Sequence, residues 1–339
     1  MTTAFVKEIG EQPEALRKLA GFYRGEGREL LARWRGLAAG TARVVFIGMG
    51  TSEYVAESAV PQLTAQGLDA SVADAGEWLH YPRVSKGLKV LISQSGESVE
   101  TRKVAERDGG APGYVAITNN PASSIARQAG LHLPLLAGHE TAITTKTYVN
   151  SLAVLHLMAQ TEATLDQALD RLEQASQTMA GYSLERIEAA AGLIADAGCL
   201  HAISRGPAMA AAKQTSLTYM EGTRTAVTPF TGGTFRHGPF ELVGPGHRAL
   251  FFIPQGRTYE LLQSMAVEVA EKGSQVVAIT DRPFTLPGKA CVLQVPAHGE
   301  EVFPICAATT QELLLDAMAR QRGVTAGVYR YGSKVTVIE

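Results

Sequence analysis

The segment KVLISQSGES, residues 89–98, runs from apolar residues into a loop that carries three serines and one glycine, and the polar segment VETRKVAERDGG follows it. An apolar run that ends in a turn and continues as an amphipathic segment predicts a buried strand followed by a helix. Three hydroxyl groups at that junction exceed what a turn needs. The loop is therefore a candidate ligand site.

The same order of parts recurs in the second half of the chain. KVLISQSGES matches ALFFIPQGRT, residues 249–258, with Gly96 over Gly256 and Ser98 over Thr258. The spacing between equivalent positions drifts by only a few residues, which indicates two copies of one α/β unit with small loop insertions. Two further pairs of segments match in the same order: ARVVFIGMGTSEYVAESAV (from residue 42) with AGCLHAISRGPAMAAAKQT (from residue 197), and GYVAITN (from residue 113) with QVVAITD (from residue 275).

Each copy alternates short apolar runs with amphipathic segments, which is the pattern of a parallel sheet covered by helices on both faces. We therefore predict an α/β protein with two doubly wound parallel sheets, flavodoxin-like or Rossmann-like in organisation. The expected parts are an N-terminal helical segment (1–24), a first domain (25–165), a helical linker (166–184), a second domain (185–325) and a C-terminal tail (326–339).

In doubly wound sheets, ligands bind beyond the carboxyl ends of strands, and the serine loop lies at such an end. A helix that starts near Glu97 directs its free N–H groups and positive dipole end at the loop, which favours a monophosphate. A serine that simply caps the helix is the alternative, but it accounts for only one hydroxyl group. The polar side chains around Gly96 are Ser93, Gln94, Ser95 and Ser98.

Two nucleotide-binding motifs do not fit. A P-loop needs a lysine after its second glycine, and none is placed here. The segment GMGTSE, residues 48–53, begins like a dinucleotide fingerprint but has Glu53 where the third glycine belongs. Ser52 fits better as another hydroxyl directed at the same anion. We expect no cofactor, and no metal either, because no H-E-x-x-H motif or Cys/His cluster occurs.

The overall composition and charge indicate which kinds of partner to expect. The net charge is −2 and no Lys/Arg run appears, so we expect neither nucleic acid nor membrane as partner. The N-terminus lacks the apolar core of a signal peptide, and no apolar stretch reaches the length of a membrane span. Cys199, Cys291 and Cys306 are scattered among apolar residues, which predicts buried, reduced thiols and a cytoplasmic location.

Six segments, taken in order, resemble the sugar isomerase (SIS) family. The closer resemblance is to the isomerase half of the glutamine–fructose-6-phosphate amidotransferases, the glucosamine-6-phosphate synthases. The resemblance covers nearly the whole chain and implies two tandem SIS domains. The segments are EIGEQPEALR, GMGTS, SQSGES, ETAITTKTYVNSLAVL (one residue shorter than in the family), RHGPFELV and YRYGSKVTVIE.

The resemblance implies roles for particular residues. Glu221 would move a proton between C1 and C2, His237 would open the sugar ring from the neighbouring subunit, and Lys334 would engage the open-chain carbonyl. A homodimer is therefore expected, with His237 contributed across the interface. The residues expected at the sugar 6-phosphate are Ser52, Ser93, Gln94, Ser95 and Ser98, and those expected at the sugar are Gly50, Thr51, Ile143, Thr144 and Arg330.

The segment RGPAMAAAKQTSLTYMEG predicts a helix with Pro207 in its first turn and Gly222 just past its end. Glu221 would then be the last helical residue, where the negative end of the dipole should raise the pKa of its carboxyl group towards that of a general base. Gln214 and Thr218 share its face. Both depart from the synthase pattern, which has a glutamate and a lysine there. Without the resemblance, a solvent-exposed terminal glutamate is the simpler interpretation.

The other two candidate catalytic residues lie outside predicted helices. His237 is in the turn FRHGP, and an imidazole can transfer protons near neutral pH, although most single histidines are structural. Lys334 precedes the apolar segment VTVI, which predicts that the tail docks. Docking would place Lys334 in a partly dry site and lower the pKa of its amine.

The departures from the synthase suggest a relative that acts on another amine. The chain begins MTTAF and shows no segment like the glutaminase, so we expect no glutamine hydrolysis. Our first interpretation is a hexosamine-6-phosphate deaminase/isomerase, which forms a ketose 6-phosphate and ammonia. A fructosamine-6-phosphate deglycase is the second interpretation, and a non-catalytic, sugar-phosphate-binding regulatory protein is the third.

Overall fold

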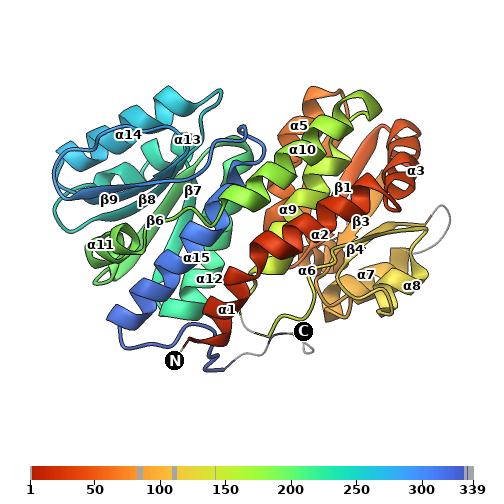
Figure 1. Ribbon diagram of the computed structural model, residues 1–339, viewed down its shortest axis with the longest axis horizontal. Coiled ribbons are helices and arrows are strands. Elements are labelled where there is room, and N and C mark those ends of the chain that lie inside the picture. Colours follow the sequence, from red (N-terminus) through yellow and green to blue (C-terminus); the bar gives the residue numbers. More distant parts are fainter. Residues whose placement is uncertain (1, 82–86, 109–112, 142, 332–333, 335–339) are drawn as a thin grey trace. The chain divides into compact units, whose positions relative to one another are not determined.

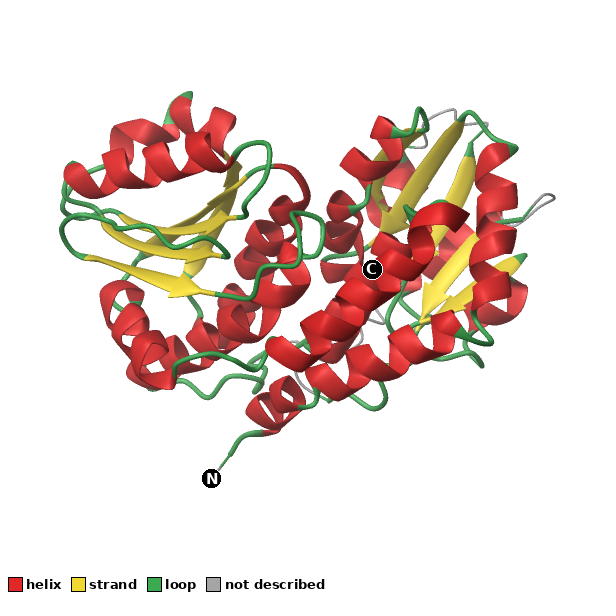
Figure 2. Ribbon diagram, turned by 45° about the horizontal axis from the view of Figure 1, so that its top comes forward, coloured by secondary structure: helices red, strands yellow, loops and turns green. Residues whose placement is uncertain are grey.

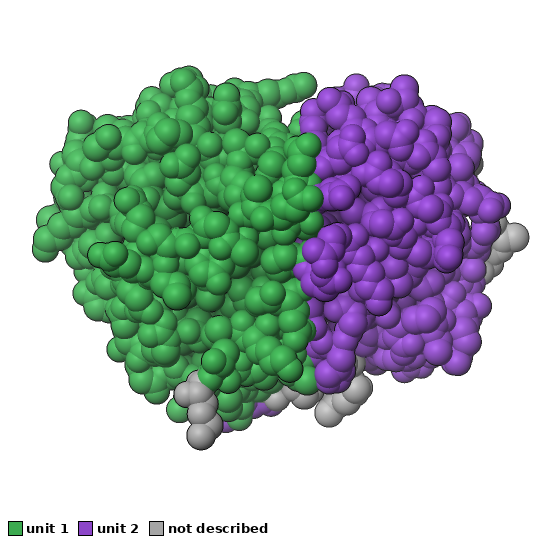
Figure 3. All heavy atoms as spheres, in the orientation of Figure 1, with its two compact units in different colours: residues 1–13, 141–145, 174–330 green, residues 14–140, 146–173, 331–339 purple. Residues whose placement is uncertain are grey.

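The computed structural model describes the chain except for residues 1, 82–86, 109–112, 142, 332–333 and 335–339. The chain divides into two compact units, coloured separately in Figure 3. Unit 1 comprises residues 1–13, 141–145 and 174–330, and unit 2 comprises residues 14–140, 146–173 and 331–339.

Unit 2 contains a five-stranded sheet with the strand order β2-β1-β3-β4-β5, in which every neighbouring pair is parallel. The strands are β1 (Arg43–Gly48), β2 (Asp69–Asp74), β3 (Leu88–Ile92), β4 (Val115–Thr118) and β5 (Leu131–Pro134). The helices of this part of the chain are α2 (Gln12–Arg24), α3 (Arg28–Ala39), α4 (Thr51–Tyr54), η1 (Val55–Ser58), α5 (Val60–Ala65), α6 (Ala75–His80), α7 (Val99–Asp108), α8 (Ser124–Gln128), α9 (Lys146–Met158) and α10 (Glu162–Thr178).

Unit 1 contains a second sheet, with the order β10-β9-β8-β6-β7 and again only parallel pairs. Its strands are β6 (Cys199–Ser204), β7 (Ala226–Thr231), β8 (Arg248–Ile253), β9 (Gln275–Thr280) and β10 (Ala290–Gln294). Its helices are α1 (Ala4–Gly10), α11 (Leu184–Ile194), η2 (Gly206–Ala208), α12 (Met209–Thr223), α13 (Gly232–Arg236), η3 (Pro239–Leu242), α14 (Tyr259–Glu271) and α15 (Phe303–Gln321).

The two sheets have the same topology. Numbered within its own unit, each runs 2-1-3-4-5, which is the flavodoxin-like order. Gly50 and Gly206, which align in the sequence, both have positive φ angles, 54° and 58°. The predicted duplication and the predicted α/β class are therefore confirmed.

Both faces of each sheet are covered by helices, which explains why the strands are apolar runs without alternation (Figure 2). In unit 1, α13 and α14 cover one face and α11, α12 and α15 the other (Figure 1). Alternate residues of β8, namely Ala249, Phe251 and Ile253, pack in one buried cluster with α13 and α14. In unit 2, β1, β3 and β4 pack in the same way against α6, α7 and α8.

Two sequence expectations need correction. Helix α12 does not end before Gly222: it runs on to Thr223, and Arg224 forms the left-handed cap with φ 58°. Glu221 is therefore in the last turn rather than at the last position, because a glycine in the last turn need not be the cap. Of the three cysteines, only Cys306 is buried, whereas Cys199 is exposed at the first residue of β6.

Among the described residues, no helix is both long enough and apolar enough to cross a membrane.

Candidate functional site

The serine loop lies at the topological switch point of the unit 2 sheet. Strand β1 is central, with β2 on one side and β3 on the other, so successive connections leave β1 and β3 in opposite directions. In this architecture, ligands bind at the switch point, beyond the carboxyl ends of the strands. GMGTS follows β1, and SQSGES follows β3.

Hydrogen bonds within the loop fix its shape. The hydroxyl oxygen of Ser93 accepts from the N–H of Gly96 at 3.1 Å, and that of Ser95 accepts from the N–H of Glu97 at 3.1 Å. A hydroxyl that accepts still carries a proton that it can donate to an anion. The hydroxyl of Ser98 donates to the Glu100 carboxylate at 3.4 Å. A bound phosphate would replace this carboxylate as the acceptor of the Ser98 hydroxyl.

Gly96 allows the loop to close on its neighbour. Its φ is +68°, and a Cβ atom built there would lie 2.0 Å from the Ser123 hydroxyl oxygen. A side chain at this position is excluded both by backbone conformation and by space. The N–H of Asn119 donates to the carbonyl of Gln94 at 3.0 Å and so ties the loop to the end of β4.

The GMGTS segment turns sharply at Gly50, where φ is 54°, and Thr51 and Ser52 begin the short helix α4. Both side chains are half-buried. A Cβ atom at Gly48 would lie 2.8 Å from the backbone of Ser52, so glycine is needed for this close approach. Sequence reasoning had identified both loops, and the structure places both at the same switch point.

Lys334 also belongs to unit 2. Its ammonium nitrogen donates to Oε2 of Glu140 at 2.6 Å, and the two side chains are 19% and 0% exposed. The predicted docking of the tail holds at this residue, although the apolar segment 335–338 on which the prediction rested is outside the described residues.

Glu140 is a buried carboxylate that sequence reasoning did not single out. Besides Lys334, it accepts from Thr147, through the N–H at 3.1 Å and the hydroxyl at 2.7 Å. Burial acts to raise the pKa of Glu140, but the nearby Lys334 charge and the hydrogen bonds outweigh it, and the pKa lies below its usual value. Glu140 is the first residue of the segment ETAITTK. The sequence feature that could have pointed to it is an acidic residue beside a run of small residues.

In unit 1, the sugar-loop residue Ile143 lies next to the end of α12. Its Cδ1 atom would be 3.0 Å from a Cβ atom built at Gly222, the residue after Glu221. Ile143 is buried, and Thr144 and Glu221 are half-buried. The structure therefore brings the predicted sugar loop beside the predicted base.

Two residues that depart from the synthase pattern are buried in α12. Gln214 and Thr218 are almost inaccessible, and the Thr218 hydroxyl donates to the Gln214 carbonyl at 2.9 Å. The face that they share with Glu221 is therefore largely buried. The Thr218 hydroxyl can be buried there because a threonine hydroxyl in a helix can bond to a carbonyl of the preceding turn.

His237 and Arg330 lie at the surface of unit 1. His237 follows α13 and its N–H donates to the Thr234 carbonyl at 3.0 Å, while its side chain is exposed. Arg330 is exposed as well. The predicted site residues are therefore divided: Gly50, Thr51, Ser52, Ser93, Gln94, Ser95, Ser98 and Lys334 belong to unit 2, and Ile143, Thr144, Glu221, His237 and Arg330 belong to unit 1.

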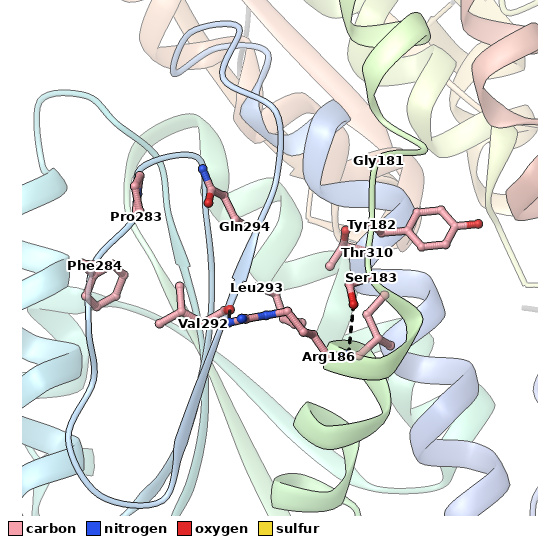
Figure 4. Close-up of a pocket in the computed structure, with 11 residues that line it drawn as sticks. Gly181, Tyr182, Ser183, Arg186, Pro283, Phe284, Val292, Leu293, Gln294 and Thr310 are labelled. Carbon is pink, nitrogen blue, oxygen red and sulfur yellow. Dashed lines mark hydrogen bonds between the residues drawn. The ribbon is translucent and has the colours of Figure 1, made fainter.

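None of the predicted site residues lines a surface cavity of about 410 Å³ in unit 1 (Figure 4). There the Arg186 guanidinium donates to the Val292 carbonyl at 2.6 Å. A cavity of about 300 Å³ in unit 2 is not lined by any of them either. Within the described ranges, no group of three or more His, Cys, Asp or Glu side chains is arranged to hold a metal ion.

Comparison with known proteins agrees with the duplicated fold. The SIS domain model matches twice, at residues 39–160 and 193–320, which together make up most of the chain. The chain belongs to the SIS domain family. Each match contains one of the two parallel sheets described above.

The curated relatives include glutamine–fructose-6-phosphate aminotransferases. That of Methanocaldococcus jannaschii is 29% identical over 91% of this chain and 28% of its own length, and that of Aeropyrum pernix is 29% identical over 98% of this chain and 57% of its own length. The SIS chain thus spans about half, or less, of the relatives that it matches.

Solved structures show the same fold at lower identity. The C-terminal domain of glucosamine-fructose-6-phosphate aminotransferase from Francisella tularensis has a TM-score of 0.83 at 20% identity, covering 96% of this chain and 98% of that one. Glucosamine-6-phosphate deaminase from Thermotoga maritima has a TM-score of 0.73 at 17% identity, covering 99% and 100%.

Proposed function

We propose that this SIS protein is a phosphosugar isomerase that acts on an amino-sugar 6-phosphate. It would convert a hexosamine 6-phosphate and water into a ketose 6-phosphate and ammonia. The observation that carries the proposal is the serine loop around Gly96, which offers hydroxyl groups and the start of α7 at the switch point of the unit 2 sheet. The names of three of the relatives, two glutamine–fructose-6-phosphate aminotransferases and one glucosamine-6-phosphate deaminase, support the substrate class.

The loop would hold the 6-phosphate and leave the other end of the sugar to the reacting groups. Hydrogen bonds to a dianionic phosphate are charge-assisted and are roughly twice as strong as neutral ones. Ser93 is buried and would anchor the loop, while the half-buried Ser95 and Ser98 are better placed to reach the ligand. Binding at C6 fixes the substrate without touching the carbons that react.

Glu221 would act as the base on the ring-opened sugar. Its carboxylate removes the proton from C2, which carries the amine, and returns a proton to C1, so that C2 becomes an imine carbon. Water then adds to C2 and ammonia leaves, which gives the ketone. Because Glu221 is in the last turn of α12, the negative end of the helix dipole strengthens it as a base.

His237 and Lys334 would complete the chemistry. The imidazole can take a proton from the ring hydroxyl at C1 and deliver it to the ring oxygen, which opens the ring. The Lys334 ammonium would donate a hydrogen bond to the carbonyl oxygen on C1 and stabilise the charge that develops there.

Release of ammonia from glucosamine 6-phosphate, followed with a coupled assay, tests the reaction. The wild-type chain should form fructose 6-phosphate and ammonia in equal amounts, and Glu221→Gln should lose activity by about 1,000-fold because general-base catalysis is removed. Glu271→Gln, at the exposed end of α14 in the same unit, is the matched control and should keep full activity.

Other outcomes select the alternatives. Turnover of fructoselysine 6-phosphate without turnover of glucosamine 6-phosphate would show a deglycase. Binding of a hexose 6-phosphate with no turnover of either would show a regulatory protein. Either result overturns the proposed deaminase.

We propose further that a second copy of the chain supplies His237, which is exposed in the single chain. Mixing His237→Ala chains with Glu221→Ala chains should then restore part of the activity, because each mixed dimer holds one complete set of groups. Inactive mixtures would contradict a site shared between copies.

A further inference from the structure

The buried carboxylate of Glu140 lies between β5 and α9 in unit 2, with a fully buried side chain. It accepts two hydrogen bonds from Thr147, the second residue of α9. The third contact is the 2.6 Å hydrogen bond from the Lys334 ammonium. One carboxylate therefore joins the start of a core helix to a residue near the end of the chain.

Thr147 orients this carboxylate within unit 2. A buried charge costs several kcal/mol unless it is paired and hydrogen-bonded, and the N-terminus of α9 offers both an N–H donor and the positive end of the dipole. Since Thr147 binds both carboxylate oxygens, the rotamer of Glu140 is fixed by the unit itself. The chain thus presents a formed anion to the tail.

The structure describes two residues of segment 331–339, Tyr331 and Lys334. Tyr331 is 93% exposed, whereas the Lys334 side chain is only 19% exposed. Lys334 is therefore the described residue of segment 331–339 at which the tail enters unit 2. The pairing at 2.6 Å is charge-assisted, and such bonds are the stronger class.

We propose that Glu140 is the positioning residue for Lys334: its carboxylate draws the C-terminal tail onto unit 2 and fixes the location of the ammonium group before substrate binds. The part that concerns catalysis rests on the proposed function, in which Lys334 engages the sugar carbonyl. The part that concerns tail docking does not.

Acylation of lysine side chains by a brief pulse of acetic anhydride, read residue by residue by mass spectrometry, tests docking without any substrate. In Glu140→Gln, which keeps the shape but loses the charge, Lys334 should react at least about fivefold faster, because an ammonium held by a carboxylate is shielded from the reagent. Lys7, which is 76% exposed, is the internal reference and should not change.

Glu106→Gln is the matched control. Glu106 is in the same unit and pairs with Arg102 at 2.9 Å, but its side chain is half exposed. The Lys334 rate should be unchanged in this variant. An unchanged rate in folded Glu140→Gln overturns the proposal.

If Glu140→Gln does not fold, the variant Thr147→Val provides the test of the proposal. It keeps the carboxylate charge and removes only the 2.7 Å hydrogen bond that orients Glu140. The Lys334 rate should then rise by about twofold or more, and an unchanged rate overturns the proposal.

Kinetics separate positioning from a purely structural role. In Glu140→Gln, kcat per folded molecule should fall by about 100-fold while KM for the sugar phosphate stays within about threefold, because the phosphate loop is untouched. An unchanged kcat overturns the catalytic part. Faster Lys334 acylation together with a wild-type chain that turns over no sugar phosphate supports Glu140 as the anchor and rejects the proposed function.

Discussion

The loop after β3 in unit 2 and the loop after β8 in unit 1 occupy equivalent places in two sheets of identical strand order, yet their backbone N–H groups bond to different kinds of side chain. In unit 2, the N–H groups of Gly96 and Glu97 bond to serine oxygens. In unit 1, the N–H of Gln255 donates to the Asp281 carboxylate at 2.6 Å, and that of Arg257 donates to the Glu300 carboxylate at 3.3 Å.

The two loops differ in the side chains that accept hydrogen bonds from their backbone N–H groups. In unit 1 the chain's own carboxylates take the backbone donors, and Ile253 and Pro254 stand where unit 2 has Ser93 and Gln94. The glycines show the same contrast, since a Cβ atom at Gly256 would lie 2.2 Å from the Glu300 carboxyl carbon. A shared topology thus provides two equivalent loops, and their side chains give them different hydrogen-bond partners.

The largest effect that we expect from testing this comparison is that of Gly96→Ala. It should lower the free energy of unfolding of unit 2 by about 4 kcal/mol, from the left-handed φ together with overpacking against Ser123. It should also abolish binding of a hexose 6-phosphate. Urea unfolding and calorimetry are the measurements.

Gly256→Ala is the paired control for that substitution. The atoms that a Cβ would meet there are the carboxyl atoms at the end of the long Glu300 side chain, which can change rotamer, so the cost should stay below about 1 kcal/mol. Equal destabilisation by the two substitutions would show that the two loops do not differ in the way described.

An effect of intermediate size concerns acid stability. His156 in α9 is fully buried, neither ring nitrogen has a hydrogen-bond partner in the described structure, and burial lowers its pKa to about 4. The unfolded histidine titrates near 6.5, so stability is complete above about pH 6.5 and is lost as the pH falls towards 4. His156→Leu should remove this loss, a gain of about 2 kcal/mol at pH 5 in urea unfolding.

The buried histidines of unit 1 provide the contrast. His247, whose pKa burial also lowers to about 4, bonds through its ring nitrogens to His201 at 2.9 Å and to the Ser274 hydroxyl at 3.0 Å. His247→Leu removes both hydrogen bonds, including the one to the buried His201 ring, and should destabilise unit 1 at neutral pH. A gain in stability at neutral pH from this variant would contradict the role given to the hydrogen bonds.

The smallest effect is on ligand affinity. Ser95→Ala should weaken binding of a hexose 6-phosphate by about tenfold, the loss of one charge-assisted hydrogen bond, with a stoichiometry of one per chain. Thr258→Ala, which removes the remaining hydroxyl of the equivalent loop in unit 1, should leave both values unchanged. Two equivalents bound per chain, or equal weakening by both variants, would argue against a single phosphate site.

The duplication, the α/β class and the two loops of the switch point were predictable, because each depends on short stretches of sequence whose pattern is local. The end of α12 was not, since Gly222 lies inside the last turn and packs against Leu315, a residue distant in the sequence. The exposure of Cys199 was missed for a similar reason: it starts a strand whose remaining residues are buried.

The sequence alone determined two copies of a strand–loop–helix unit and a serine-rich loop in the first, because apolar periodicity and turn residues act between near neighbours. Only the tertiary structure decided that Glu140 meets Lys334 and that Asp281 and Glu300 fill the second loop. Those contacts join residues far apart in the chain, and the burial that selects their partners exists only once the sheets and helices have packed.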